Sequence, residues 1–296
     1  MKKKNLTVFA NFLIDSYERF ERLKDSYNSF KNANIDSWVI NIRGSYKKKV
    51  KYFLLKNIIK KKILIFDLDS GNWFEDVKLM LKSINSKLVF IWIEDHICLK
   101  NPTNFNKIIN EMLRKNIDYL QYSFFLFGLP LKSLVKIKLK QSKNLVYFNY
   151  TTPLLQKRLD WFGENYHQNL LEYIISLTSI MNTKLFKKII LSNEFTFFSK
   201  NNPFSFEKNT NQIQWLPYKL AITKQEFFAA IDSDQHTEGY SLISRGIYKK
   251  RKTQKMMNEI RERNTGSIYN FYGKIYFSKS VQLIKEFIKK YCDKNK

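Results

Sequence analysis

The sequence predicts an α/β protein, built on an open, mixed and mostly parallel sheet flanked by helices, with a helical and loop-rich C-terminal part. Two observations predict this class. Short apolar runs alternate with helix-length segments over roughly the first 125 residues, which is the pattern of repeated β-α units. The chain of 296 residues is 44% hydrophobic and 16% aromatic, so it can bury a substantial core.

The chain opens with one β-α-β unit. The apolar run Leu6–Leu13 is followed by Asp15-Ser16, which are residue types that cap helices. Apolar residues then recur at helical spacing up to Phe30. Strand character returns at Ser37–Ile42, before a turn at Arg43-Gly44-Ser45.

The same rhythm continues through the next segments. Ile63–Phe66 predicts a buried strand, and a helix is expected over 77–84. Leu88–Ile93 predicts the following strand, Asn101-Pro102 marks the start of an amphipathic helix, and Tyr119–Phe125 predicts another strand. Strands alternating with helices of this length favour a sheet covered on both faces.

The rhythm loosens in the second half of the chain. A strand is expected at Leu145–Tyr150, a long helical pattern runs over 170–190, and loop-rich segments occupy 193–217 and 232–245. Loops of that length in a compact domain are usually functional. In chain order, the expected organisation is a donor-binding half over 1–128, an acceptor-side half of the same catalytic domain over 129–246, and a basic C-terminal extension over 247–296.

The composition limits the compartment and the partners. Cys98 and Cys292 lack any neighbouring ligand pattern, so neither a disulfide framework nor a cysteine zinc site is indicated. Polar residues interrupt the first apolar run too early for an export signal, and no window is apolar enough to span a membrane, so a cytoplasmic protein is expected. The net charge of +26 attracts nucleic acid, anionic headgroups or phosphorylated substrates, but A/T-rich codon usage would also produce it.

An acidic pair supplies the most informative motif. Glu94 and Asp95 follow an apolar strand and precede a proline-started helix. In open α/β sheets, ligands bind at the carboxyl ends of strands. Carboxylates in that position hold a divalent cation, Mn²⁺ or Mg²⁺, together with substrate phosphates.

Three segments carry a resemblance to a known family. Residues 90–123 resemble the part of family-2 glycosyltransferases in which an acidic DxD-type motif is followed by a proline, an amphipathic helix and a strand. Residues 6–44 are similar to that family's nucleotide-holding opening, and 176–191 to its acceptor-side strand and helix. The resemblance implies a GT-A-type fold and a hexosyltransferase-type enzyme, inverting and metal-assisted, in surface polysaccharide or glycoconjugate synthesis.

The resemblance also implies a metal site. Glu94 and Asp95 stand at the family's last two acidic positions, whereas Trp92 stands where a first acid is common. A site with one carboxylate fewer would bind metal weakly or use lysine and arginine instead. His96 is either a further metal ligand, a phosphate donor or a buried, hydrogen-bonded histidine.

Donor-binding residues are expected along the same edge of the sheet. Asp67 and Asp69 end the third strand, where they either contact the nucleoside or form a local turn. Arg245 and the run Lys249–Lys252 either clamp a diphosphate or form a solvated basic face. The full donor set expected is Asn11, Asn41, Arg43, Asp67, Asp69, Glu94, Asp95 and Arg245.

The catalytic base is expected downstream of the acceptor-side segment. Inverting members of the family use a carboxylate that takes the proton of the acceptor hydroxyl. Glu207 is the first candidate, with Asp232 and Asp234 as rivals. The alternative for Glu207 is a solvated loop residue.

Two other functions compete with glycosyl transfer. Aromatic and basic residues interleave at 267–279, which suits nucleic-acid binding, but no nucleic-acid motif accompanies them and no specific nucleic acid is expected. A metal-dependent phosphohydrolase would use four acidic residues around two cations, namely Asp67, Asp69, Glu94 and Asp95. The expected partners are a nucleotide-sugar donor, a glycan or lipid-linked acceptor, and an anionic membrane surface met by Tyr248–Arg263 and the C-terminal tail.

Overall fold

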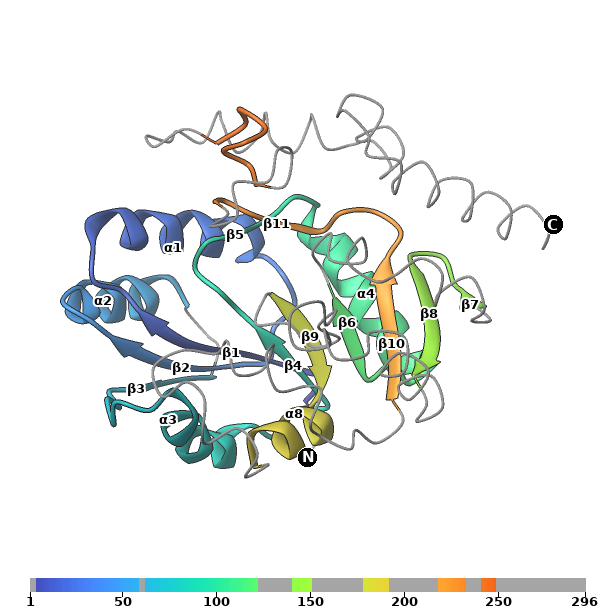
Figure 1. Cartoon of the computed structure of the whole chain (residues 1–296), viewed down its shortest axis with the longest axis horizontal. Coiled ribbons are helices and arrows are strands. Elements are labelled where there is room, and N and C mark those ends of the chain that lie inside the picture. Colours follow the sequence, from blue (N-terminus) through green and yellow to red (C-terminus); the bar gives the residue numbers. More distant parts are fainter. Residues whose placement is uncertain are drawn as a thin grey trace, which may run out of the picture.

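A computed structural model gives the structure of the chain, and it describes residues 4–58, 62–121, 140–150, 178–191, 218–232 and 241–248. It confirms the predicted α/β class with a mixed sheet flanked by helices, while most of the C-terminal part expected to be helical and loop-rich lies outside the described residues. A nine-stranded sheet has the order β3-β2-β1-β4-β9-β6-β10-β8-β7, and helices pack on both of its faces (Figure 1). β8 and β9 run against the other seven strands, so the sheet is mixed: four of its eight neighbouring pairs are parallel and four are antiparallel.

The strands of the large sheet are short, and their bounds follow the apolar runs of the sequence. They are β1 (Leu6–Leu13), β2 (Ser37–Arg43), β3 (Lys62–Phe66), β4 (Leu88–Ile91), β6 (Tyr119–Gln121), β7 (Lys140–Gln141), β8 (Leu145–Tyr150), β9 (Ser179–Asn182) and β10 (Tyr218–Thr223). Alternate residues of β1 enter opposite cores because side chains alternate along a strand. Val8 and Phe12 join one apolar cluster, and Phe9 joins the other.

The helices form two layers. The first layer contributes to one cluster and the second layer to the other. The first layer is α1 (Tyr17–Phe30), α2 (Lys47–Asn57) and α4 (Pro102–Lys115), and the second is α3 (Trp73–Met80), η1 (Leu81–Ser83) and α8 (Thr183–Leu191). Among the described residues, none of the helices combines the length and apolar character that crossing a bilayer requires.

Local sequence signals set several helix ends. The Ser16 side chain accepts a hydrogen bond from the Arg19 N–H, as an N-cap does. Asn101 caps α4 in the same way, and Pro102 occupies its first turn. Asn116 ends α4 in the left-handed conformation, with φ of 51°. The predicted starts of α1 and α4 are therefore confirmed.

The long helix expected over 170–190 is wrong in its central part. Residues 179–182 form β9, which lies antiparallel between β4 and β6, and α8 begins only at Thr183. A short buried run has the same composition in a helix and in a central strand, so periodicity does not separate them. The strand predicted at Tyr119–Phe125 is described only as far as Gln121.

A second, small sheet lies over α1. It pairs β5 (His96–Cys98) with β11 (Phe228–Ala230) in antiparallel register. A third apolar cluster, which includes Ile97, Ile231 and Leu242, packs this sheet against the segment 241–248. Neither strand was expected from the sequence, because three residues are too few to show a period.

Candidate donor site

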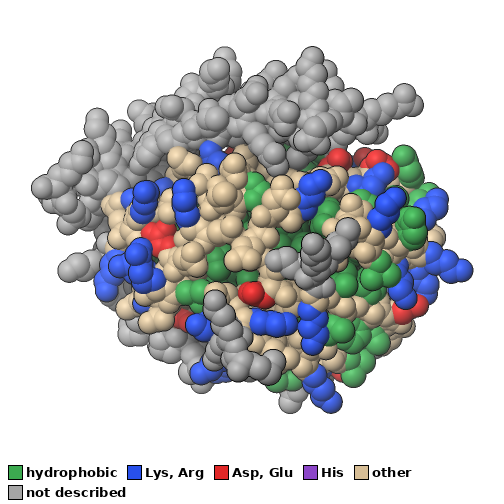
Figure 2. Space-filling model, turned by 180° about the vertical axis from the view of Figure 1, so that it is seen from behind, with side chains coloured by type: hydrophobic (Ala, Val, Ile, Leu, Met, Phe, Trp, Pro, Cys, Tyr) green, Lys and Arg blue, Asp and Glu red, His purple; other side chains and the backbone are tan. Residues whose placement is uncertain are grey.

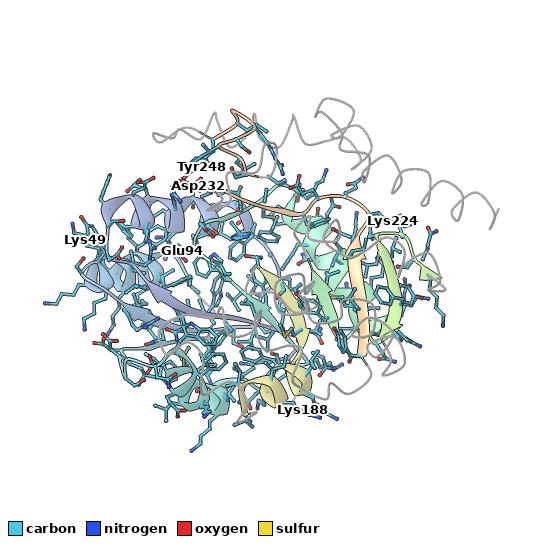
Figure 3. The ribbon with its side chains drawn as sticks, in the orientation of Figure 1. Lys49, Glu94, Lys188, Lys224, Asp232 and Tyr248 are labelled. Atoms are coloured by element: carbon cyan, nitrogen blue, oxygen red, sulfur yellow. The ribbon has the colours of Figure 1, made fainter. Side chains whose placement is uncertain are left out.

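The strand order defines where a ligand would bind. From β1 the chain moves outward to β2 and β3, and it then crosses back to place β4 on the other side of β1. Crevices at such a switch point, outside the carboxyl ends of the strands, are the usual ligand sites of open α/β sheets. Glu94 and Asp95 lie in the turn that follows β4, at this switch point (Figure 3).

Two acidic groups are held together in that turn. Burial and the neighbouring negative charge of Asp95 raise the pKa of Glu94 to about 7. Burial alone would raise the pKa of Asp95 as well, but the charge and hydrogen bond of His96, with help from Arg22, lower it below its usual range. The protein therefore stabilises the ionised form of Asp95, whereas the positive charge near Glu94 is too weak to do the same for Glu94.

His96 contacts the carboxylate of Asp95. Its Nδ1 lies 2.6 Å from Asp95 Oδ1, and its ring is 2% exposed. Nε2 is buried and has no hydrogen-bond partner among the described residues. This placement matches the buried, hydrogen-bonded alternative for His96. A role as a metal ligand stays a prediction.

Trp92 belongs to the core. Its side chain is 1% exposed and packs edge-on against Phe12, with ring centroids 4.8 Å apart. Its Nε1 donates to Ser26 Oγ over 2.8 Å, and that hydroxyl donates to the backbone oxygen of His96. Trp92 thus anchors the acidic turn to α1.

Two arginines from α1, which the sequence did not single out, face this turn. Arg22 Nη2 lies 2.8 Å from Glu18 Oε1 and 3.3 Å from Asp232 Oδ2. Arg19 lies near enough to Glu94 to lower its pKa. The only sequence signal was the i, i+4 spacing of Glu18 and Arg22, which is common on exposed helices.

Asp232 is the one proposed catalytic residue that the structure describes, and it lies beside the acidic turn (Figure 3). The Ile231 N–H donates to the backbone oxygen of Asp95 over 2.6 Å. The segment 241–248 also lies beside these residues, because the Leu242 N–H donates to the Ala230 oxygen. Glu207 and Asp234 lie outside the described residues, as does Lys249–Lys252.

Asn11 and Asn41 join the ends of three strands. Asn41 Nδ2 donates to Asn11 Oδ1 over 3.0 Å and to the Leu68 oxygen over 2.9 Å, and its Oδ1 accepts from the Leu68 N–H over 2.8 Å. Arg43 is 7% exposed, and its Nε is buried without a hydrogen-bond partner among the described residues. Such a donor costs free energy until something accepts from it.

The remaining predicted donor residues are Asp67, Asp69 and Arg245. Asp67 and Asp69 are exposed, and Asp67 pairs with Lys47 over 2.9 Å. The Arg245 side chain is buried and forms two hydrogen bonds of 2.9 Å to Glu226. The structure therefore brings Glu94, Asp95 and Asp232 together, and it gives Arg245 a protein carboxylate as partner.

Comparisons with known proteins give only distant likenesses. No protein-family model and no curated protein matches the chain. Among solved structures, S. aureus TarS 1–349 in complex with UDP-GlcNAc has a TM-score of 0.46 at 13% identity, covering 96% of this chain and 81% of that one. The inositol-1-phosphate CTP transferase from T. maritima has a TM-score of 0.42 at 10% identity, covering 88% and 97%.

A third likeness is to glucosyl-3-phosphoglycerate synthase from Mycobacterium tuberculosis with Mn²⁺ and UDP, with a TM-score of 0.36 and 11% identity, covering 62% of this chain and 58% of that one. Scores this low decide nothing about activity, and these structures include both sugar and nucleotidyl transferases. The function has to be argued from the chain's own residues.

The residues present fit a divalent cation shared with a substrate. Among the described residues, no group of three or more His, Cys, Asp or Glu side chains is arranged to hold a metal. Mg²⁺, however, is commonly bound through one or two carboxylates while substrate phosphates and water supply the other oxygens. Glu94 and Asp95 supply two carboxyl groups, close enough that the charge of Asp95 helps to raise the pKa of Glu94.

Proposed function

We propose that this chain is a glycosyltransferase that moves a sugar from a nucleotide-sugar donor to a glycan or lipid-linked acceptor, in the synthesis of surface polysaccharide or glycoconjugate. The observation that carries the proposal is the Glu94–Asp95 pair at the switch point of the sheet, with Arg22 and Asp232 beside it. Phosphates need positive charge, and an acceptor hydroxyl needs a base; this arrangement offers candidates for both.

The donor diphosphate would lie over the acidic turn. Glu94 and Asp95 would hold Mn²⁺ or Mg²⁺ against it, and the cation would neutralise charge on the departing nucleoside diphosphate. His96 holds Asp95 in place through the 2.6 Å contact. Arg19 and Arg22 supply further positive charge from α1, and guanidinium groups suit phosphate oxygens.

The nucleoside would lie along the ends of β1, β2 and β3. Asn11 and Asn41 fix the backbone around Leu68, so they shape that edge of the site. Arg43 brings a buried Nε that still needs an acceptor. Asp67 and Asp69 are exposed at the same edge and stay candidates for the ribose or base.

Asp232 is the candidate base that the described structure supports. Arg22 orients its carboxylate at 3.3 Å, and the backbone contact of Ile231 ties it to Asp95. The carboxylate would take the proton from the acceptor hydroxyl as that oxygen attacks the anomeric carbon, which inverts the configuration. Glu207 and Asp234 stay rivals for this role.

The same proposal includes a location in the cell. A lipid-linked acceptor would bring a cytoplasmic enzyme to the inner face of a membrane, and a chain of net charge +26 is attracted to anionic headgroups. The proposed contacts are Tyr248–Arg263 and the C-terminal tail.

The first experiment is a thermal-shift panel of UDP, GDP, CMP and dTDP, each with and without Mn²⁺. A ligand that binds only the folded state stabilises it, by about 2.7 kcal/mol when the ligand concentration is a hundredfold above Kd, and this raises the melting temperature. We expect one nucleotide to raise the melting temperature in the presence of Mn²⁺. The variant Glu94→Ala/Asp95→Ala should lose that shift.

The matched control is Glu21→Ala/Glu75→Ala, which also removes two carboxyl groups, each from an acid that pairs with a lysine of its own helix. This control should keep the nucleotide shift. Arg22→Ala and Asp232→Asn should separate the roles, because the first weakens nucleotide binding while the second keeps binding and loses transfer. A panel without any nucleotide shift would contradict the proposal and favour nucleic-acid binding.

A further inference from the structure

The charged residues of helix α2 are all basic. It has five lysines and no acidic residue, and all five lysines are exposed. Lys47 pairs with Asp67, which leaves four lysines toward solvent. We call the outward part of the helix the α2 surface: Lys48, Lys49, Lys51, Tyr52, Leu55 and Lys56.

Apolar side chains lie among these lysines. Tyr52 is 69% exposed and Leu55 is 50% exposed, although Val50 and Leu54 on the opposite face are fully buried in the core. The helix has therefore already packed one apolar face against the sheet, and it presents a second one to solvent. A groove beside it is lined by aromatic and basic residues, namely Phe20, Tyr52, Phe53, Lys48, Lys49 and Lys56.

The position of α2 leaves this surface accessible. The helix lies at the edge of the molecule, and Lys49 projects outward there (Figures 1 and 3). Lysine and arginine side chains outnumber acidic ones over the face seen from behind (Figure 2). α2 begins just after Gly44, at the carboxyl edge of the sheet where the acidic turn also lies.

We propose that the α2 surface binds the anionic headgroups of a phospholipid membrane. Lysines around a headgroup layer are attracted by its negative potential, and an exposed tyrosine and leucine between them enter the interfacial region. The charge complementarity favours an anionic partner, and Leu55 favours lipid over nucleic acid because bases stack on aromatic rings but not on an aliphatic side chain. Membrane binding here would bring the edge of the proposed donor site close to the bilayer.

The test is co-sedimentation of the full chain with vesicles of phosphatidylcholine, with or without phosphatidylglycerol. The variant Lys48→Gln/Lys49→Gln/Lys51→Gln/Lys56→Gln removes four charges from the surface. The control Lys107→Gln/Lys143→Gln/Lys184→Gln/Lys188→Gln removes four from exposed sites on other elements. Each lysine near an anionic bilayer contributes roughly a fivefold factor in partitioning, so the first variant should bind at least a hundredfold more weakly.

The control should bind the anionic vesicles within a fewfold of the parent chain. Tyr52→Ser/Leu55→Ser should bind less than the parent and keep its salt dependence, because it alters the apolar contact alone. The inference is overturned if the control loses as much binding as the α2 variant, or if the α2 variant binds normally. It is also overturned if the α2 lysines matter for a single-stranded oligonucleotide and not for vesicles. None of these measurements needs turnover, so they stand apart from the test of glycosyl transfer.

Discussion

The buried pair Glu226 and Arg245 leads to a prediction about stability in which the two partners are unequal. Their side chains are 7% and 3% exposed and share two hydrogen bonds of 2.9 Å. Lys100, only 8% exposed, lies near enough for its charge to lower the pKa of Glu226. Burial nevertheless raises that pKa above its usual value, so desolvation outweighs both cations.

Removing the acid should therefore cost more than removing the arginine. Glu226→Gln removes the buried carboxylate that faces both Arg245 and Lys100, and breaking such a buried pair costs about 3–5 kcal/mol. For a chain of this size, that loss lowers the melting temperature by on the order of 10 °C. Arg245→Met leaves Glu226 facing Lys100, so its cost should be clearly smaller.

The assay is equilibrium unfolding in urea, with the melting temperature as a second measure. The control is the half-buried pair Glu75 and Lys78 at the surface of α3, 2.7 Å apart, where Glu75→Gln should change stability by less than about 0.5 kcal/mol. A cost for Arg245→Met that equals or exceeds the cost for Glu226→Gln would refute the charge balance. So would a Glu226→Gln chain as stable as the parent.

Two further predictions concern the edge of the proposed site. Gly44 has φ of +94°, and an added Cβ would lie 2.5 Å from the Ile14 oxygen, so Gly44→Ala should lose at least about 2 kcal/mol of unfolding free energy. Gly71 is also at positive φ but has open space around it, so Gly71→Ala should lose less. Equal losses in the two variants would argue against the close contact at Gly44. Because the pKa of Glu94 is raised from 4.5 to about 7, the folded chain binds more protons than the unfolded chain in that window, and stability falls as pH rises through it. Glu94→Gln should thus melt higher than the parent at pH above about 7 without divalent ions, and this gain should vanish below about 4.5; a gain that is the same at both pH values would count against the shifted pKa.

Local features of the sequence were enough for the first half of the fold. The runs that became β1, β2 and β4 are rich in β-branched and aromatic residues, and Ser16 and Asn101 cap helices through contacts within three residues along the chain. The acidic pair was also readable, because its position depends only on the strand before it and the helix after it. Signals of this kind survive in the sequence since they depend on neighbours along the chain.

The tertiary structure decided the rest. Arg22 and Asp232 are 210 residues apart, and no pattern in either segment indicates that they meet. Trp92 and Arg245 carry groups suited to a site, yet their neighbours in space turn the first into a core residue and the second into a buried ion pair. Partners for buried polar groups are chosen by the packing of distant elements, which sequence spacing does not record.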